Sequence, residues 1–243
     1  MDKIRFLNGN LLKIVGLITM TIDHIGFFLF PGVLWFRIVG RIAFPIFAYM
    51  IAQGCLHTRS PIRYFMSVFG LGLGCQIALY FVAKTLYMGI LISFSFSIAM
   101  IFCLKRVILD KQSPIIKRIA YAVGFVVLLS FACVVDLLLK GIDYGYFGCL
   151  LPVGAFLPNL LPDKVSENKK HLLSIFLMAV FMAPIALNAG IRYGFQIQWF
   201  SYLALIPLLS YSGKRGKINL KYLFYIYYPA HLATIFLIRA VGQ

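Results

Sequence analysis

Long apolar segments recur from one end of this 243-residue chain to the other. A membrane-spanning helix needs about 20 mainly apolar residues, and it pairs its backbone N–H and C=O groups internally because the bilayer core offers no water. Hydrophobic residues make up 62% of the sequence and charged residues 12%, so too few polar side chains remain to cover a water-soluble globule. The sequence therefore predicts an all-α, polytopic transmembrane helical bundle that contacts the lipid bilayer.

Charged and Pro/Gly-rich points divide the chain into about nine candidate spans, which we interpret as one integral-membrane domain, residues 1–243. The first apolar run lacks a small-residue cleavage signature, so we expect it to be retained as a span. The sixth span is short and contains two prolines, which leaves open whether it is complete or re-entrant. The spans are expected at residues 11–30, 33–53, 64–83, 86–104, 119–139, 147–162, 171–189, 195–211 and 221–240.

The basic residues between these spans indicate an orientation. With a cytoplasmic N-terminus, 17 of the 23 Lys and Arg residues fall on the inner side and four on the outer side, while Arg37 and Arg41 lie inside the second span. This asymmetry is typical of cytoplasmic loops and predicts a multi-pass protein of the inner or plasma membrane. It also explains the net charge of +16 without a nucleic-acid partner.

The five cysteines lie singly in apolar surroundings and form no C-x-x-C spacing. We therefore expect neither a disulfide framework nor a metal site.

The stretch "TMTIDHIGFFLFPG" places Asp23 and His24 within the first span, at the same expected depth as Arg37 and Arg41 in the second. A charge near the bilayer centre costs at least about 2.5 kcal/mol, so each such group needs a partner, a water-filled cavity or a function. The two spans are joined only by "FPG", which predicts a tight antiparallel hairpin and an ion pair from Asp23 to either arginine. Such a pair can serve packing alone.

A second histidine, His231, lies in "YYPAHL" of the last span, with Tyr227 and Tyr228 preceding it on the same helix face. Two histidines, an acid and arginines at similar depth suit two classes of membrane function. In acyl transfer, an imidazole takes a proton from an acceptor hydroxyl or amine, and cationic or hydroxyl donors stabilise the oxyanion. In proton-coupled transport the same groups form a relay. The residues alone leave both classes open, and a purely structural role for each histidine as well.

Four motifs, taken in order along the chain, carry a family resemblance. The stretches "LKIVGLITMTIDHIGFFLFPG", "RIVGRIAFPIFAYMIAQGCLHTRSPIRY", "DYGYFG" and "GKRGKINLKYLFYIYYPAHL" together resemble the TraX family, membrane proteins named for the F-pilin acetylating factor. The resemblance implies a transmembrane acyltransferase that carries an acetyl group from cytoplasmic acetyl-CoA to an acceptor on the far side of the membrane. It marks Asp23, His24, Arg41, His57, Arg59, Asp143, Tyr228 and His231, and Lys13 as the basic residue that precedes the catalytic histidine.

We therefore predict an acyltransferase that uses acetyl-CoA or a similar acyl-CoA and acts on a glycan, a lipid or a protein amine. His24 is the predicted general base and Asp23 its orienting acid. Neighbouring helix positions point about 100° apart, so the orienting acid can instead act through Arg41 or come from Asp136 or Asp143. Arg41 is expected to position an anion or the oxyanion, and His231 is the alternative base. The coenzyme A phosphates are assigned to Lys13, His57, Arg59 and Arg63, and the acceptor to Arg37, Asp143, Tyr144 and Tyr228. The alternatives are a proton-coupled transporter or flippase and a non-enzymatic membrane assembly factor.

Overall fold

The computed structural model describes residues 5–84, 87–139, 141–193, 196–218 and 220–241. Lys3 and Lys140, which the orientation argument uses, lie outside these residues. Within the described ranges the regular structure is helical, and the pairings outside helices are two isolated bridges. The helices, in chain order, are α1 (Gly9–Phe28), α2 (Leu34–Gly40), α3 (Ala43–His57), α4 (Pro61–Ala83), α5 (Ile90–Ile108), α6 (Ile115–Leu139), α7 (Gly145–Phe156), η2 (Leu157–Leu160), α8 (Glu167–Tyr193), η3 (Gln196–Ala204), α9 (Leu205–Leu209) and α10 (Lys221–Val241).

The all-α, polytopic prediction is confirmed. Seven described segments are long and apolar enough to cross a membrane. The predicted sixth and eighth spans correspond to the shorter apolar segments Gly145–Leu160 and Gln196–Leu209. The count of nine spans and the cytoplasmic N-terminus stay predictions.

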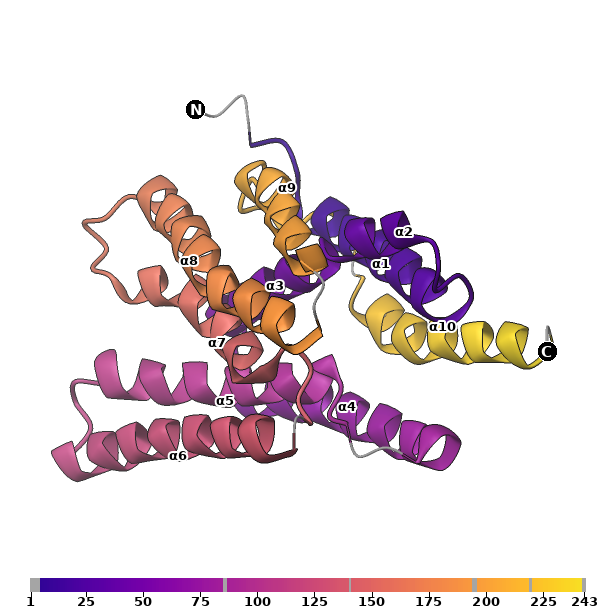
Figure 1. Cartoon of the computed structure of the whole chain (residues 1–243). Coiled ribbons are helices and arrows are strands. Elements are labelled where there is room, and N and C mark those ends of the chain that lie inside the picture. Colours follow the sequence, from indigo (N-terminus) through magenta and orange to yellow (C-terminus); the bar gives the residue numbers. More distant parts are fainter. Residues whose placement is uncertain (1–4, 85–86, 140, 194–195, 219, 242–243) are drawn as a thin grey trace. The chain divides into compact units, whose positions relative to one another are not determined.

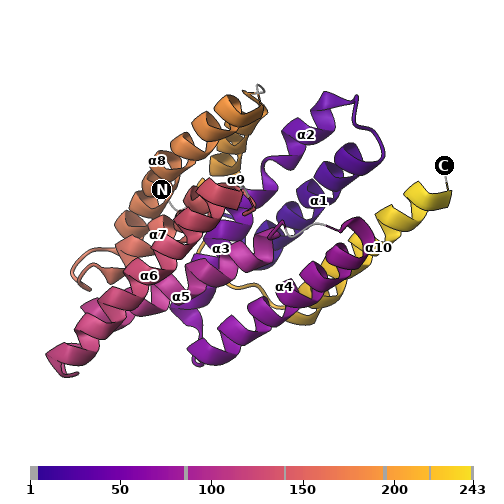
Figure 2. The same cartoon turned by 60° about the horizontal axis from the view of Figure 1, so that its bottom comes forward.

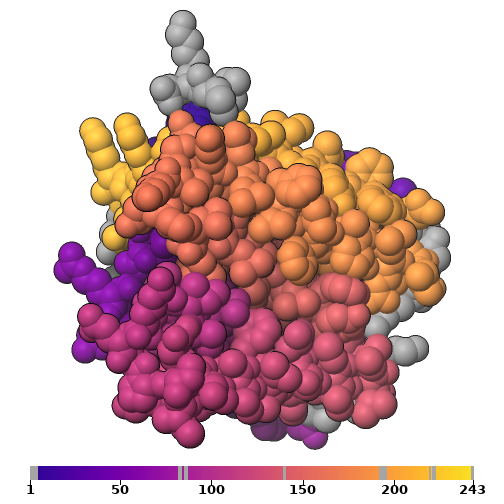
Figure 3. Space-filling model, turned by 90° about the vertical axis from the view of Figure 1, so that its left-hand side faces the viewer, coloured from indigo at the N-terminus to yellow at the C-terminus, as the bar shows by residue number. Residues whose placement is uncertain are grey.

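The chain divides into two compact units, one formed by the segments up to residue 50 and from 186 onward, the other by residues 51–185. A single domain over residues 1–243 stays a prediction. In the second unit, α5 packs against α4, α6 and α7, and the atoms of α5 and α6 adjoin in the space-filling view (Figure 3). Small buried serines line α5, and the Ser97 hydroxyl donates to the Cys149 carbonyl at 2.7 Å, which ties α5 to α7.

In the first unit, α1 and α2 form the predicted antiparallel hairpin, and they lie side by side in Figure 2. Glycines permit this close approach: a Cβ atom at Gly26 would collide with Phe36, and one at Gly40 would collide with the Asp23 side chain. Larger residues at these positions would separate the two helices.

The predicted second span is interrupted between α2 and α3, at Arg41 and Ile42. Pro45 lies in the first turn of α3, and a proline ring clashes with the carbonyl of the residue four positions before it, here Arg41. The interruption leaves the Arg41 N–H shared between the carbonyls of Arg37 and Ile38. It places the Arg41 side chain at the end of a short helix beside α1.

Helix α10 runs parallel to α1, as the two ribbons show in Figures 1 and 2. The residue numbers of the contacting pairs increase together along both helices. The pairs are Lys13 with Phe224, Thr21 with Tyr227, and Phe28 with Phe236. Parallel first and last spans require an odd number of crossings. If all seven long segments cross the membrane, the two short apolar segments therefore either both cross it or both do not.

Candidate active site

Two histidines from the ends of the chain meet between α1 and α10. The Nδ1 atom of His24 lies 2.8 Å from the Nε2 atom of His231, and the Nδ1 atom of His231 lies 2.9 Å from the carbonyl oxygen of Tyr227. His231 is 7% exposed and His24 is half-buried. The imidazoles therefore form a hydrogen-bonded chain that ends on the backbone of α10.

This series of hydrogen bonds assigns the neutral tautomers of both imidazole rings. A carbonyl oxygen only accepts, so Nδ1 of His231 carries the hydrogen and its Nε2 holds a lone pair. That lone pair requires a donor, so Nδ1 of His24 is also protonated. The remaining nitrogen, Nε2 of His24, is then an unprotonated base, and it makes no hydrogen bond within the described residues.

Packing around the pair fixes the register of α10 on α1. The Thr21 and Tyr227 hydroxyls lie 2.7 Å apart, one helical turn before the histidines. The Tyr227 ring stacks on His231 with centroids 5.3 Å apart, and the Tyr228 ring meets His231 edge-on at 5.6 Å. A buried cluster of Leu17, Met20 and Ala43 underlies both tyrosines.

On another face of α1, Asp23 binds Arg37 of α2 and Arg41, which directly follows α2. Its two carboxylate oxygens accept from Nη2 of Arg41 at 2.5 and 2.6 Å, and Nη1 of Arg37 lies 2.9 Å from Oδ2. Arg37 also lies over the Phe27 ring, at 4.8 Å from its centroid. The predicted hairpin ion pair is present, and it involves both arginines.

This geometry corrects the predicted orienting role of Asp23. The ring partner of His24 is His231, while the Asp23 carboxylate turns toward α2. The cause is the rotation of about 100° between consecutive helix residues, which directs Asp23 and His24 to different neighbours. Asp136 and Asp143, the other candidate acids, belong to the second unit.

A glutamine extends the arginine cluster. Arg41 donates through Nη1 to Oε1 of Gln198 at 3.3 Å, and through Nε to the Arg37 carbonyl. Gln198 is 6% exposed, and its Nε2 atom is buried without a hydrogen-bond partner in the described chain. An unsatisfied buried donor typically costs about 1–3 kcal/mol.

The family model described as "TraX protein" matches residues 8–239, nearly the whole length of the chain. This protein belongs to the TraX family. A 40-residue stretch of this TraX protein is 52% identical to the uncharacterized protein RP591 of Rickettsia prowazekii (strain Madrid E), and it spans 16% of each chain. No solved structure matches the TraX chain.

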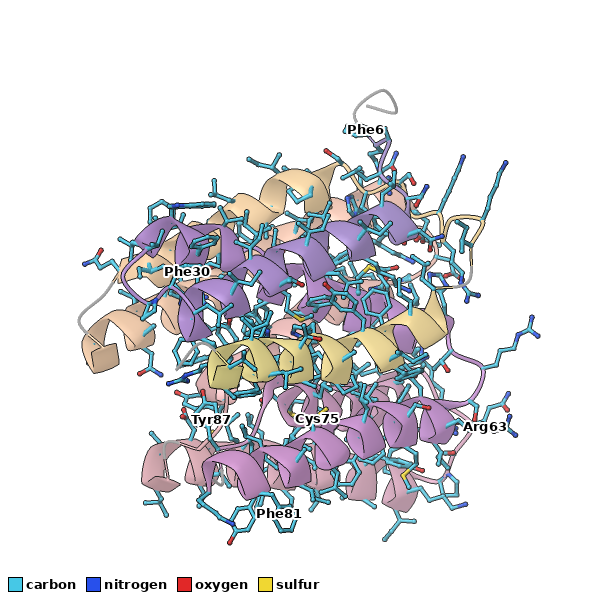
Figure 4. The ribbon with its side chains drawn as sticks, turned by 90° about the vertical axis from the view of Figure 1, so that its right-hand side faces the viewer. Phe6, Phe30, Arg63, Cys75, Phe81 and Tyr87 are labelled. Atoms are coloured by element: carbon cyan, nitrogen blue, oxygen red, sulfur yellow. The ribbon has the colours of Figure 1, made fainter. Side chains whose placement is uncertain are left out.

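The predicted coenzyme A residues of this TraX protein divide between the two units. Lys13 lies on α1, eleven residues before His24, which is about 16 Å and just over three full turns, so both residues share one helix face. The other three residues belong to the second unit and are exposed. His57 ends α3, Arg59 lies in the connection to α4, and Arg63 lies in the first turn of α4. Arg63 extends away from the start of α4 (Figure 4).

Two predicted acceptor residues, Asp143 and Tyr144, also lie in the second unit. Asp143 accepts from the Tyr87 hydroxyl at 3.1 Å, and its carbonyl accepts from Ser93. Tyr144 adopts a left-handed backbone with φ of +59°, which is rare for a bulky residue. This turn closes over the fully buried Asp136, whose Oδ2 atom accepts from the Tyr146 N–H at 3.3 Å.

Sequence reasoning missed two features of the TraX site. Gln198 lies in "QIQWFS", where a polar residue in an apolar segment gave a signal that was not used. The pairing of the two histidines was missed because it depends on packing between helices 207 residues apart.

Proposed function

We propose that this TraX protein is a membrane acyltransferase that moves an acetyl or similar acyl group from acyl-CoA to a hydroxyl or amine acceptor. The observation that carries the proposal is the chain from His24 through His231 to the Tyr227 carbonyl, because it presents one unprotonated imidazole nitrogen as a base. A triad of the Ser-His-Asp type uses the same logic, in which a third group fixes the tautomer of the catalytic imidazole.

In the proposed reaction, Nε2 of His24 removes the proton of the acceptor hydroxyl or amine as the acceptor attacks the thioester carbonyl. A carbon–oxygen or carbon–nitrogen bond forms, and the carbonyl oxygen becomes an oxyanion. Collapse of this intermediate breaks the carbon–sulfur bond, and the thiolate of coenzyme A receives the proton from His24. Nε2 of His231 accepts a hydrogen bond from Nδ1 of His24, and this bond stabilises the transient imidazolium of His24.

The position of Lys13 supports a donor that approaches from the N-terminal end of α1. Lys13 shares a helix face with His24, and its Nζ lies 5.5 Å from the centroid of the Phe224 ring of α10. A cation near the N-terminal end of α1 suits the phosphates of coenzyme A. The acyl end of the donor would then extend along α1 toward the histidines. With the N-terminus in the cytoplasm of a plasma-membrane protein, the acyl donor enters from the cytoplasmic face.

The same chain of imidazoles suits a proton relay, so proton-coupled transport is the competing function. The two functions differ in their product. Acyl transfer leaves a covalently acylated acceptor and a free coenzyme A thiol, whereas transport leaves the transported molecule chemically unchanged.

Inside-out membrane vesicles test the proposal, because they contain the native glycan, lipid and protein acceptors. Acetyl-CoA labelled in its acetyl group is added to vesicles from cells that produce the protein and from cells that lack it. We expect protein-dependent covalent label in the glycan, lipid or protein fraction, with equal release of coenzyme A thiol. Equal label in both vesicle types, at matched protein levels, would contradict acyl transfer.

A further inference from the structure

Gln198 is a buried polar side chain that contacts the arginine cluster formed by Asp23, Arg37 and Arg41. Its amide oxygen accepts a hydrogen bond from Arg41, whereas its amide nitrogen has no partner in the described chain. Gln198 lies in the nine-residue 3₁₀ helix η3, which is long for this kind of helix. Three residues per turn align Gln198, Ser201 and Ala204 on one face, and these are the buried residues of η3. The helix type thus turns the amide inward, toward the α2 side of the unit.

Hydrogen-bond chemistry fixes the orientation of this amide. The Arg41 guanidinium has donors only, so the atom that faces it must be the amide oxygen, Oε1, at 3.3 Å. The amide nitrogen, with two hydrogens, is then directed elsewhere in a buried environment without an acceptor among the described residues. Buried donors of this kind are rare in folded proteins, and they are expected where a ligand supplies the acceptor.

The contact with Arg41 also strengthens the free donor. A cation that binds the oxygen of an amide withdraws electron density from it, and consecutive hydrogen bonds polarise one another. A polarised N–H donor suits an oxygen that gains negative charge during a reaction. Side-chain amides serve this purpose in oxyanion holes.

Gln198 is linked to α1 through Arg41 and Asp23, on the helix face next to the one that carries His24. His24 follows Asp23 on α1, Asp23 binds Arg41, and Arg41 binds Gln198. We propose that Nε2 of Gln198 donates to the carbonyl oxygen of the acyl thioester and stabilises the oxyanion that forms when the acceptor attacks. This inference rests on the proposed acyl transfer. It gives Arg41 an indirect part, in which the guanidinium positions and polarises the glutamine.

The rival role for Gln198 is structural, as an acceptor that satisfies Arg41. Substitution of Gln198 by Glu separates the two roles, because a carboxylate keeps the acceptor for Arg41 and removes the N–H donor. The matched control is Gln196→Glu, the same change at the exposed first residue of η3.

Ligand binding is measured on protein in lipid nanodiscs, and turnover in the membrane vesicles described above. The probes are acetyl-CoA and S-ethyl-coenzyme A, a thioether of similar size that lacks the carbonyl oxygen. We expect the wild type and Gln196→Glu to bind acetyl-CoA more tightly than the thioether, and Gln198→Glu to bind both equally. In the vesicle assay, we expect Gln198→Glu to lower turnover by about 10²- to 10³-fold with an unchanged thermal midpoint.

The outcomes separate this inference from the proposed function. Full turnover and an intact acetyl-CoA preference in Gln198→Glu would overturn the donor role and leave Gln198 as a partner for Arg41. If that variant does not fold, equal binding of the two probes by the wild type overturns the donor role instead. Absence of transfer by a wild type that retains the acetyl-CoA preference would count against acyl transfer and not against the Gln198 contact.

Discussion

The Asp23 carboxylate binds two guanidinium groups within segments that are apolar enough to span a membrane. Its side chain is 13% exposed and that of Arg41 is 12% exposed, so neither charge is well solvated. Breaking a buried pair by removing one partner is strongly destabilising, since the other charge is left uncompensated. Asp23 therefore stabilises the α1–α2 hairpin by binding both arginines.

We expect Asp23→Ala and Arg41→Ala each to lower the free energy of unfolding by about 3–5 kcal/mol. The double variant should cost less than the sum of the two, because the second substitution removes an already unpaired charge. Exchange of the two residues should not restore stability, since the arginine placed on α1 would then face Arg37. Unfolding in mixed detergent micelles measures these differences, and additive costs would argue against the contact.

At the scale of the helices, the hairpin depends on two glycines that let α1 and α2 approach. Gly40 lies against the Asp23 side chain, so a methyl group there pushes on the ion pair itself. Gly32, in the turn of the same hairpin, has no atom within 4 Å of the position of an added Cβ. The turn is the place labelled Phe30 in Figure 4.

We expect Gly40→Ala to lower the free energy of unfolding by about 1–3 kcal/mol, the usual cost of overpacking. Gly32→Ala is the matched control and should change it little. Thermal unfolding of both purified variants provides the measurement. Equal stability of the two variants would show that α1 and α2 are further apart than this structure places them.

The sequence predicted the helical spans and the Asp23 ion pair, because both follow from local signals: apolar length, and opposite charges beside a three-residue turn. It did not predict the break at Arg41, although Pro45 offered a signal for it. The sequence did not predict the His24–His231 contact or the inward orientation of Gln198, for different reasons. The histidine contact depends on how the two ends of the chain pack together. The orientation of Gln198 depends on a 3₁₀ helix with three residues per turn, where an α-helix would have 3.6.

At the scale of the whole chain, the parallel packing of α1 and α10 predicts that the two ends of the chain lie on opposite faces of the membrane. The basic residues predict a cytoplasmic N-terminus. We therefore expect the connection between α5 and α6, which includes Gln112, to be cytoplasmic as well.

Single cysteines in a cysteine-free background test this topology. We expect Gln112→Cys to react with a membrane-impermeant thiol reagent only from the cytoplasmic side, and Ala240→Cys only from the outside. Reaction of position 112 from outside would reverse the orientation. Reaction of both positions from the same side would contradict the parallel packing of α1 and α10.

In the proposed acyl transfer, Nε2 of His24 is the base, and His231 holds His24 in the required tautomer. His24→Asn tests this role most directly, since the asparagine amide can still donate to His231 while no basic nitrogen remains. We expect acyl transfer from labelled acetyl-CoA to fall by about 10²- to 10⁴-fold with normal folding and normal acetyl-CoA binding. Thr234→Ala, at an exposed position one turn from His231 on α10, is the control and should transfer at the wild-type rate. Wild-type transfer by His24→Asn would contradict the claim.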